Sequence, residues 1–280
     1  MSQRFIVEKD FHNTRFDRWF RLNILNIPQS LIEKFIRKKK VKINKKKVKT
    51  SYRVQEGDVI EIFDLLKIKK RDTPKLEKYK ATVRDKKNNE DFIIENNDNF
   101  IVINKPSGIA VQSGTKSFKN IIDILKDTKF FLEKKPFIVH RIDKETSGLL
   151  LVAKNREYAQ LFTSLFRIRK MHKSYLAITY GKVSSKIKKL DDRLIIYENK
   201  KRVMQKAISY INVIKSNDNF SLLEINPVTG RKHQIRRQLY NIGNPIVGDT
   251  KYNLKNSTYY KKLMLHAFKI KFMINDIKYN

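Results

Sequence analysis

The sequence predicts an α+β fold in two parts, a small α/β unit followed by a larger unit whose mixed, mostly antiparallel sheet is flanked by helices. The chain has 280 residues, of which 40% are hydrophobic, and this is enough for a large domain with a small one beside it. Residues 64–91 are polar, charged and weakly periodic, which predicts a linker. Beyond them, strand and helix patterns follow one another without the β-α-β rhythm of a parallel sheet. We therefore place the two units at residues 1–63 and 92–280.

Two helices are expected in the first unit. Thr14 and Asp17 have the spacing of a capping box, and aromatic residues follow at near-helical spacing. Pro28 is expected to end this helix. Ser30 and Glu33 form a second capping box, which opens a helix that closes in four consecutive basic residues.

Strands are expected in both units. Residues 41–44 alternate apolar with polar side chains, and residues 54–62 contain a turn and a closing strand. The larger unit opens with a hairpin over residues 92–103. Further strands are predicted within 148–155, 173–182, 208–215, 220–228 and 264–274, and helices within 121–127, 156–170 and 231–243.

The net charge favours a polyanionic partner. Lysine and arginine total 62 against 28 aspartates and glutamates, which gives a formal charge of +34. Lysine, isoleucine and asparagine are all abundant, as a codon bias toward A and T would also produce. Such a bias does not by itself generate this charge, and the basic runs are spread along the chain, so nucleic acid is the expected partner.

Several classes of site are excluded or not indicated. The chain has no cysteine, so a disulfide, a thiolate nucleophile or a cysteine-ligated metal is not possible. The segment 108–116 lacks the glycine spacing and the final Gly-Lys-Ser/Thr of a phosphate-binding loop. No metal signature and no cofactor motif is found. No apolar run approaches a membrane span or a signal-peptide core, so we expect a cytoplasmic protein with no membrane partner. A monomer is the default expectation.

One acidic residue lies in an unusual setting. Asp143 follows Arg141 in a polar turn that leads into the apolar run 149–152. A carboxylate close to a target and shielded from water can act as a nucleophile, and a neighbouring guanidinium favours its charged form. A structural Asp–Arg pair that closes the turn is the alternative. Tyr175, which shares a strand face with Ala177 and Thr179, could stack on a base or could simply pack.

A second cluster occupies residues 227–237. Thr229 could cap a helix whose first turn exposes backbone N–H groups, and cations surround that turn. This arrangement suits a phosphate or a buried carboxylate. A solvated basic helix face is the alternative.

These segments closely resemble the ribosomal large-subunit pseudouridine synthase family. HRIDKETSGLL at 140–150 is similar to its H-R-L-D-x-x-T-S-G-L-L signature, and TGRKHQIR at 229–236 to its T-G-R-x-H-Q-I-R motif. NKPSG at 104–108, GDTKY at 248–252 and LHA at 265–267 resemble three further blocks. The first unit resembles an S4-type RNA-binding domain, and the six residues AVQSGT that begin at Ala110 favour the C-type branch.

The resemblance implies a pseudouridine synthase domain that isomerises uridines of 23S rRNA after base flipping, without cofactor or metal. It makes Asp143 the catalytic residue and Tyr175 the residue that stacks on the base. Arg231 becomes the partner of Asp143, in a dry pocket lined by Leu149, Leu150, Val152 and Tyr175. Implied RNA contacts are Arg15, Lys34, Arg37, Lys38, Lys39, Lys105, His140, Arg141, Lys232 and Arg236. A synthase that acts on tRNA and a non-catalytic rRNA-binding or assembly factor are the alternatives.

Overall fold

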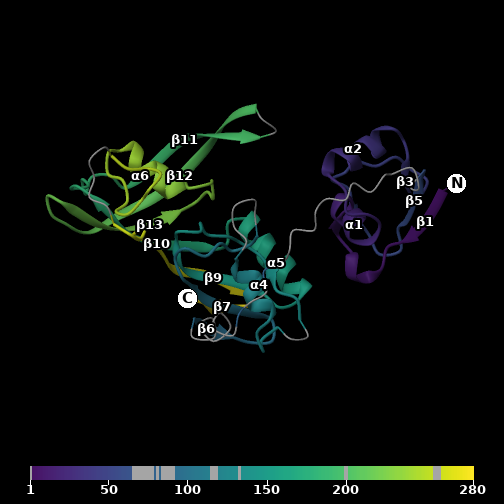
Figure 1. The fold of residues 1–280 in the computed structure, drawn as a ribbon, viewed down its shortest axis with the longest axis horizontal. Helices are drawn as coiled ribbons and strands as arrows, with labels where there is room; N and C mark the ends of the chain where they lie inside the picture. The colour runs from purple at the N-terminus through teal and green to yellow at the C-terminus, as the bar shows by residue number, and fades with distance from the viewer. Residues whose placement is uncertain are drawn as a thin grey trace. The chain divides into compact units, whose positions relative to one another are not determined.

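Apolar helix faces and a small sheet enclose the core of the first unit. In the computed structural model, which describes residues 2–64, 79, 82, 92–113, 119–131, 134–198, 201–254 and 260–280, the chain divides into two units between residues 76 and 77 (Figure 1). The predicted linker lies almost wholly outside the described residues, and its bounds stay a prediction.

The first unit contains β1 (Ser2–Ile6), a short 3-10 turn (Lys9–Phe11), β2 (Thr14–Arg15), α1 (Phe16–Asn23), α2 (Gln29–Arg37), β3 (Val41–Ile43), β4 (Arg53–Val54) and β5 (Val59–Phe63).

The two helices of the first unit are confirmed, but their predicted caps are wrong. Neither helix has a side-chain cap, because Thr14 belongs to β2 and Ser30 lies within the first turn of α2. Pro28 does not end α1, which stops at Asn23; it directly precedes α2 instead. The helices are held by packing, since Trp19 and the other aromatic side chains of α1 are buried against the sheet β1-β5-β3.

The second unit is built on one large mixed sheet. Its strands follow the order β11-β12-β13-β10-β14-β9-β7-β6, with β8 beside β9 and β15 beside β14. The elements are β6 (Ile93–Asn96), β7 (Phe100–Lys105), α4 (Ile121–Lys126), β8 (Phe137–Ile138), β9 (Ser147–Ala153), α5 (Arg156–Arg167), β10 (His172–Tyr180), β11 (Lys189–Glu198), β12 (Lys201–Ser216), β13 (Phe220–Pro227), α6 (Gln234–Asn241), β14 (Leu265–Ile274) and β15 (Ile277–Tyr279). The α+β class and the mixed sheet are confirmed, whereas β8, β11 and β15 were not predicted.

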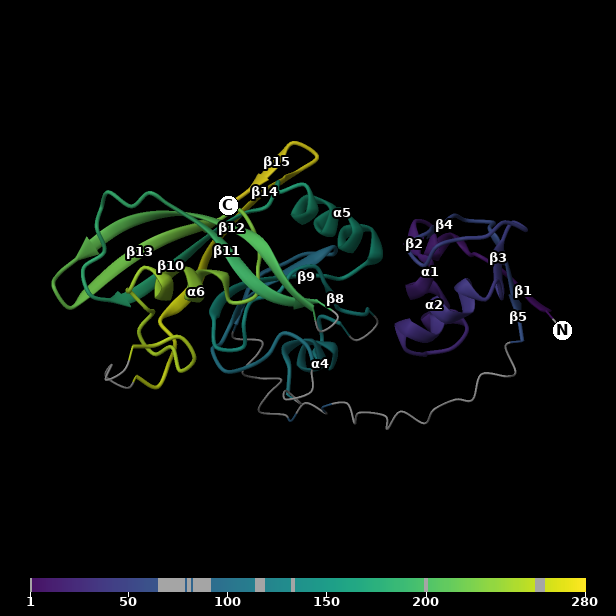
Figure 2. The same cartoon turned by 90° about the horizontal axis from the view of Figure 1, so that it is seen from above.

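Helices cover both faces of this sheet. Along β9, Leu150 and Val152 pack in the cluster that contains α4, while Leu151 and Ala153 pack in the cluster of α5. Figure 2 accordingly shows α4 and α5 on opposite sides of β9. A third cluster lies between α6 and strands β10 and β13, and Tyr175 contacts both it and the α4 cluster.

One parallel contact joins the two halves of the sheet. Among the described strands, neighbouring pairs are antiparallel except β9 and β14, where Gly148 lies opposite Ala267. Gly148 has φ +106°, and an added Cβ would overlap the carbonyl oxygen of Ala267. Only glycine fits this position, which directly follows the turn that contains Asp143. In the described part of the chain, no helix is both long and apolar enough to cross a membrane.

Candidate active site

A pocket of about 910 Å³ opens at the junction between β9, β10, β14 and the start of α6. Its walls come from residues 110–113, 141–146 and 229–236, together with Lys173, Tyr175, Pro227, 250–251 and Leu265. The apolar part of the lining includes Ile142 and Leu265. The predicted lining is confirmed for Tyr175 but wrong for Leu149, Leu150 and Val152, since Leu150 and Val152 point into the core behind the pocket.

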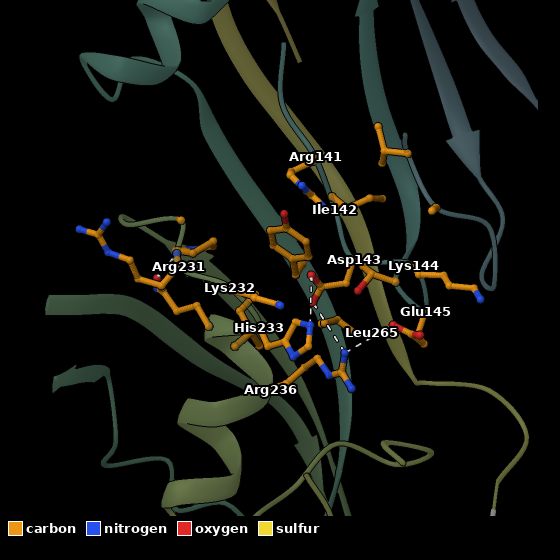
Figure 3. Close-up of a pocket in the computed structure, with 18 of the residues that line it drawn as sticks. Arg141, Ile142, Asp143, Lys144, Glu145, Arg231, Lys232, His233, Arg236 and Leu265 are labelled. Carbon is orange, nitrogen blue, oxygen red and sulfur yellow. Dashed lines mark hydrogen bonds and ion pairs between the residues drawn. The ribbon is translucent and has the colours of Figure 1, made fainter. Parts of the chain in front are cut away.

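The loop of Asp143 is held by a neighbouring loop. Lys105 Nζ and the Gly108 N–H both donate to the Lys144 carbonyl, at 3.1 and 2.8 Å, and Ser107 Oγ donates to the Glu145 carbonyl at 2.6 Å. These bonds fix the backbone on the C-terminal side of Asp143. The Asp143 side chain itself is 28% exposed and faces the pocket (Figure 3).

Lys105 is a structural residue, and its predicted role in RNA binding is wrong. The side chain is fully buried, and Nζ also donates to the carbonyls of Pro106 and Ile109 at 2.8 and 2.9 Å. Burial lowers the pKa of Lys105 to about 8, although the charges of Glu145 and Asp143 oppose the shift. A side chain that is wholly inside the protein cannot reach a phosphate.

The charged neighbours of Asp143 are Arg236 and His233, and the predicted pair with Arg231 is wrong. Arg236 Nη1 lies 3.8 Å from Asp143 Oδ2, and His233 Nε2 lies 3.9 Å from Oδ1 (Figure 3). Arg231 extends away from the carboxylate, and its Nε donates to the carbonyl of Lys206 on β12 at 3.1 Å. Arg231 lies in the loop before α6, whereas Arg236 is in the first turn of the helix.

Arg236 is buried, and Asp249 orients its guanidinium. Its Nε and Nη2 donate to the two carboxylate oxygens of Asp249 at 2.7 Å each, so only Nη1 is directed toward Asp143 and Glu145. Burial acts to lower the pKa of Arg236, but the bonds and charge of Asp249 outweigh it and raise the pKa. With 3% of its surface exposed, Arg236 is not a surface RNA contact, which corrects that prediction.

Tyr175 reaches the pocket from β10. Ala177 and Thr179 on the same strand face are buried and Ile178 is exposed, so the predicted orientation of the strand is confirmed. Burial, reinforced by the charge of Asp143, raises the pKa of the Tyr175 phenol. Tyr175 is therefore a neutral, rigid aromatic surface beside the carboxylate at physiological pH.

His140 has a role in the fold, and its predicted contact with RNA stays a prediction. Its Nε2 accepts a hydrogen bond from the Leu151 N–H at 2.9 Å, and its ring stacks on Phe166 with centroids 4.9 Å apart. Burial, with a smaller effect from the charge of Lys173, lowers the pKa of His140 to about 3. A neutral imidazole bonded to the backbone of β9 supports the fold.

Thr229 does not cap α6. Its Oγ1 accepts a hydrogen bond from the Ile208 N–H and donates to Gln234 Oε1, so it ties the loop to β12. The helix begins at Gln234 after His233, which has a left-handed φ of +53°. Sequence reasoning assigned no role to His233, Asp249 or Tyr252, although each lies inside one of the motif blocks.

The other predicted RNA contacts lie at the protein surface. Arg15 is half exposed and forms a bidentate pair with Asp17. The remaining cations, all exposed, are Lys34, Arg37, Lys38 and Lys39 around the end of α2 and Arg141 and Lys232 around the pocket. Their contacts with RNA stay predictions. Across the described residues, no cluster of three His, Asp or Glu side chains could hold a metal ion.

Comparison with known proteins places the chain among RNA-modifying isomerases. Residues 99–241 match the model of the RNA pseudouridylate synthase family, and residues 25–60 match the S4 domain. The chain belongs to the RNA pseudouridylate synthase family, which confirms the resemblance seen in the sequence.

Curated relatives support the same assignment over most of the chain. A protein of Rickettsia felis is 38% identical over 271 residues, which cover 91% of this chain and 87% of the relative. A protein of Buchnera aphidicola subsp. Schizaphis graminum is 32% identical over 282 residues, or 95% and 88% of the two chains. Both are named ribosomal large subunit pseudouridine synthase C. Among solved structures, human RNA pseudouridylate synthase domain containing 4 is 26% identical with a TM-score of 0.55, over 67% of this chain and 86% of that one.

Proposed function

We propose that this protein isomerises specific uridines of 23S ribosomal RNA to pseudouridine, with Asp143 as the catalytic residue and with no cofactor. The observation that carries the proposal is the position of Asp143, whose carboxylate faces a pocket between two cationic or polar partners and a neutral tyrosine. The names of the curated relatives favour large-subunit rRNA as the substrate.

The reaction requires access to the N1–C1′ bond and to C5 of one nucleotide. The bond between N1 and C1′ breaks, the uracil turns, and C5 bonds to C1′ while the C5 proton is lost and N1 gains one. A base inside a helix cannot do this, so it must leave the stack at a cost of about a few kcal/mol. The pocket of about 910 Å³ is large enough for a nucleoside.

Each side chain of the site has a distinct task in this proposal. Asp143 adds to the flipped uridine or its ribose and is released again as the C5–C1′ product forms. Arg236 orients and electrostatically supports the carboxylate, the role that the sequence assigned to Arg231. Tyr175 stacks on the uracil. Exposed Arg141 contacts the RNA next to the extruded nucleotide.

A single substitution tests this assignment. Asp143→Asn keeps the shape of the side chain but removes its charge, so pseudouridine formation in a 23S rRNA fragment should fall below detection while RNA binding persists. Asp218→Asn, on an exposed turn, is the matched control and should retain full activity. Undiminished product from Asp143→Asn would remove Asp143 from the mechanism. Product in tRNA alone, or bound rRNA without product from the wild type, would support one of the two alternative functions.

A further inference from the structure

A second layer of side chains lies behind the two neighbours of Asp143. This layer comes from the turn 248–252, where Asp249 accepts hydrogen bonds from the Arg236 guanidinium. Asp249 Oδ1 also accepts hydrogen bonds from the backbone N–H groups of Lys251 and Tyr252, at 2.9 Å each. The Tyr252 ring lies under the Arg236 guanidinium, 5.4 Å from ring centroid to Cζ. The turn therefore fixes the position of the Tyr252 hydroxyl as well as that of Arg236.

His233 bridges this second layer and the carboxylate. Its Nδ1 lies 3.1 Å from the Tyr252 hydroxyl oxygen, and its Nε2 lies 3.9 Å from Asp143 Oδ1. Its φ of +53° is a left-handed conformation that costs a residue with a side chain about 1 kcal/mol or more. In this backbone conformation at the N-cap of α6, the imidazole lies between the Tyr252 hydroxyl oxygen and Asp143 Oδ1.

The chemistry of the two contacts determines the tautomer. An ionised carboxylate can only accept a hydrogen bond, so the nitrogen that faces Asp143 is favoured when it carries the proton. In a neutral imidazole Nδ1 then has a lone pair, and the Tyr252 hydroxyl can donate to it. The opposite tautomer would place a lone pair against the carboxylate.

The surroundings keep His233 neutral, so the choice between tautomers matters. Burial lowers the pKa of His233, the charge of Asp143 opposes the shift, and Arg236, Lys251 and Lys232 lower the pKa further. These are the charged groups that face the ring from the Asp143 loop, from α6, from the loop before it and from the turn 248–252. At neutral pH the ring has one N–H, and its position decides whether His233 supports or repels the carboxylate.

We propose that Tyr252 is a positioning residue that holds His233 in the Nε2–H tautomer, so that His233 donates a hydrogen bond to Asp143 when uridine fills the pocket. At 3.9 Å this contact is longer than a hydrogen bond, and contacts of this kind shorten when substrate closes a site. The kinetic role rests on the proposed function, whereas the tautomer is a property of the free protein.

The tautomer can be measured directly by ¹⁵N NMR of histidine-labelled protein at pH 7.5. The chain has five histidines, and His140 is an internal reference, because its Nε2 accepts a hydrogen bond and must therefore lack a proton. We expect His233 to show the opposite pattern, a protonated Nε2 and a bare Nδ1. Tyr252→Phe should convert this single pattern into a mixture. A bare Nε2 in the wild type, or an unchanged pattern in Tyr252→Phe, would overturn the proposal.

Kinetics then test whether Tyr252 acts through His233. Tyr252→Phe keeps the ring below Arg236 and should slow single-turnover isomerisation about fivefold, the effect of one hydrogen bond of average strength. In a His233→Ala background the same change should have less than a twofold effect. Tyr240→Phe is the control, because it removes a hydroxyl from an exposed ring whose centroid lies 6.3 Å from the centroid of the Tyr252 ring. This change should leave the rate as it is in the wild type.

The remaining outcomes separate the two hypotheses. Equal losses from Tyr252→Phe with and without His233 would show that the hydroxyl acts elsewhere and would refute the positioning role. A wild type that isomerises no RNA would refute the proposed function, and the NMR result would still decide the tautomer.

Discussion

At the scale of single residues, hydrogen bonds to the protein itself decide which polar side chains of the motifs can meet RNA. Lys105, His140 and Arg236 are all close to Asp143 in sequence or space, yet each is bonded to the protein itself. Lys105 Nζ donates hydrogen bonds to three backbone carbonyls, and the Arg236 guanidinium donates two to the Asp249 carboxylate. Their contribution to catalysis in this scheme is to define the position of Asp143, which a shift of about 1 Å would compromise.

His140 makes the stability of the fold sensitive to acid. Its pKa is about 3 when folded and 6.5 when free, so below pH 6.5 the unfolded chain binds a proton that the folded chain does not. Stability should therefore fall as the pH drops from 6.5 toward 3, by about 2 kcal/mol at pH 5. His140→Gln retains an acceptor for the Leu151 N–H without titrating.

Urea unfolding of both proteins at pH 7 and pH 5 checks this. The wild type should lose about 2 kcal/mol more than His140→Gln between these values. Parallel losses would show that another group is responsible.

At the scale of elements, the parallel contact of β9 with β14 brings the site together. β9 follows the Asp143 loop, while β14 pairs with β10, the strand of Tyr175. The close approach at Gly148 and Ala267 sets how near these strands come. The carboxylate and the tyrosine thus meet through backbone packing that no side chain at position 148 would permit.

Gly148→Ala should consequently destabilise the second unit by about 3 kcal/mol or more, because the new Cβ displaces the backbone of β14. Gly243→Ala is a matched control: its φ is +81°, but an added Cβ meets no atom within 4 Å. It should cost about 1–2 kcal/mol. Thermal or urea unfolding measures both, and equal effects would mean that the β9–β14 contact can relax.

At the scale of the whole molecule, the charge of +34 is divided between two units, which we expect to contribute to RNA binding in different ways. The S4 domain presents Lys34, Arg37, Lys38 and Lys39 at the exposed end of α2. The second unit contains the pocket. Because phosphate contacts provide affinity without chemistry, the two contributions should separate experimentally.

Lys38→Glu combined with Lys39→Glu should weaken binding of a 23S rRNA fragment and flatten the dependence of log K on log salt by about 1.5. The single-turnover rate at saturating RNA should stay that of the wild type. Lys261→Glu with Lys262→Glu, two exposed positions of the second unit, makes the same change in net charge and serves as the control. An unaltered salt slope would exclude these lysines from the binding surface.

The sequence alone was enough to establish the family, the order of most helices and strands, and Asp143 and Tyr175 as candidates. Periodicity identifies local structure, and ordered motifs identify a family, so both can be read along the chain. The cap assignments of α1 and α2 failed because packing of their aromatic and aliphatic faces outweighs a local capping pattern.

Only the tertiary structure decided which charged group meets Asp143 and which is buried. Arg231 and Arg236 are five residues apart in one motif, and the choice between them depends on where α6 begins and on Asp249, 13 residues further along. The burial of Lys105 and the hydrogen bond of His140 to β9 likewise follow from loops and strands that come together in space. Contacts across the sheet join distant segments, and the direction of each side chain is fixed only when those segments pack.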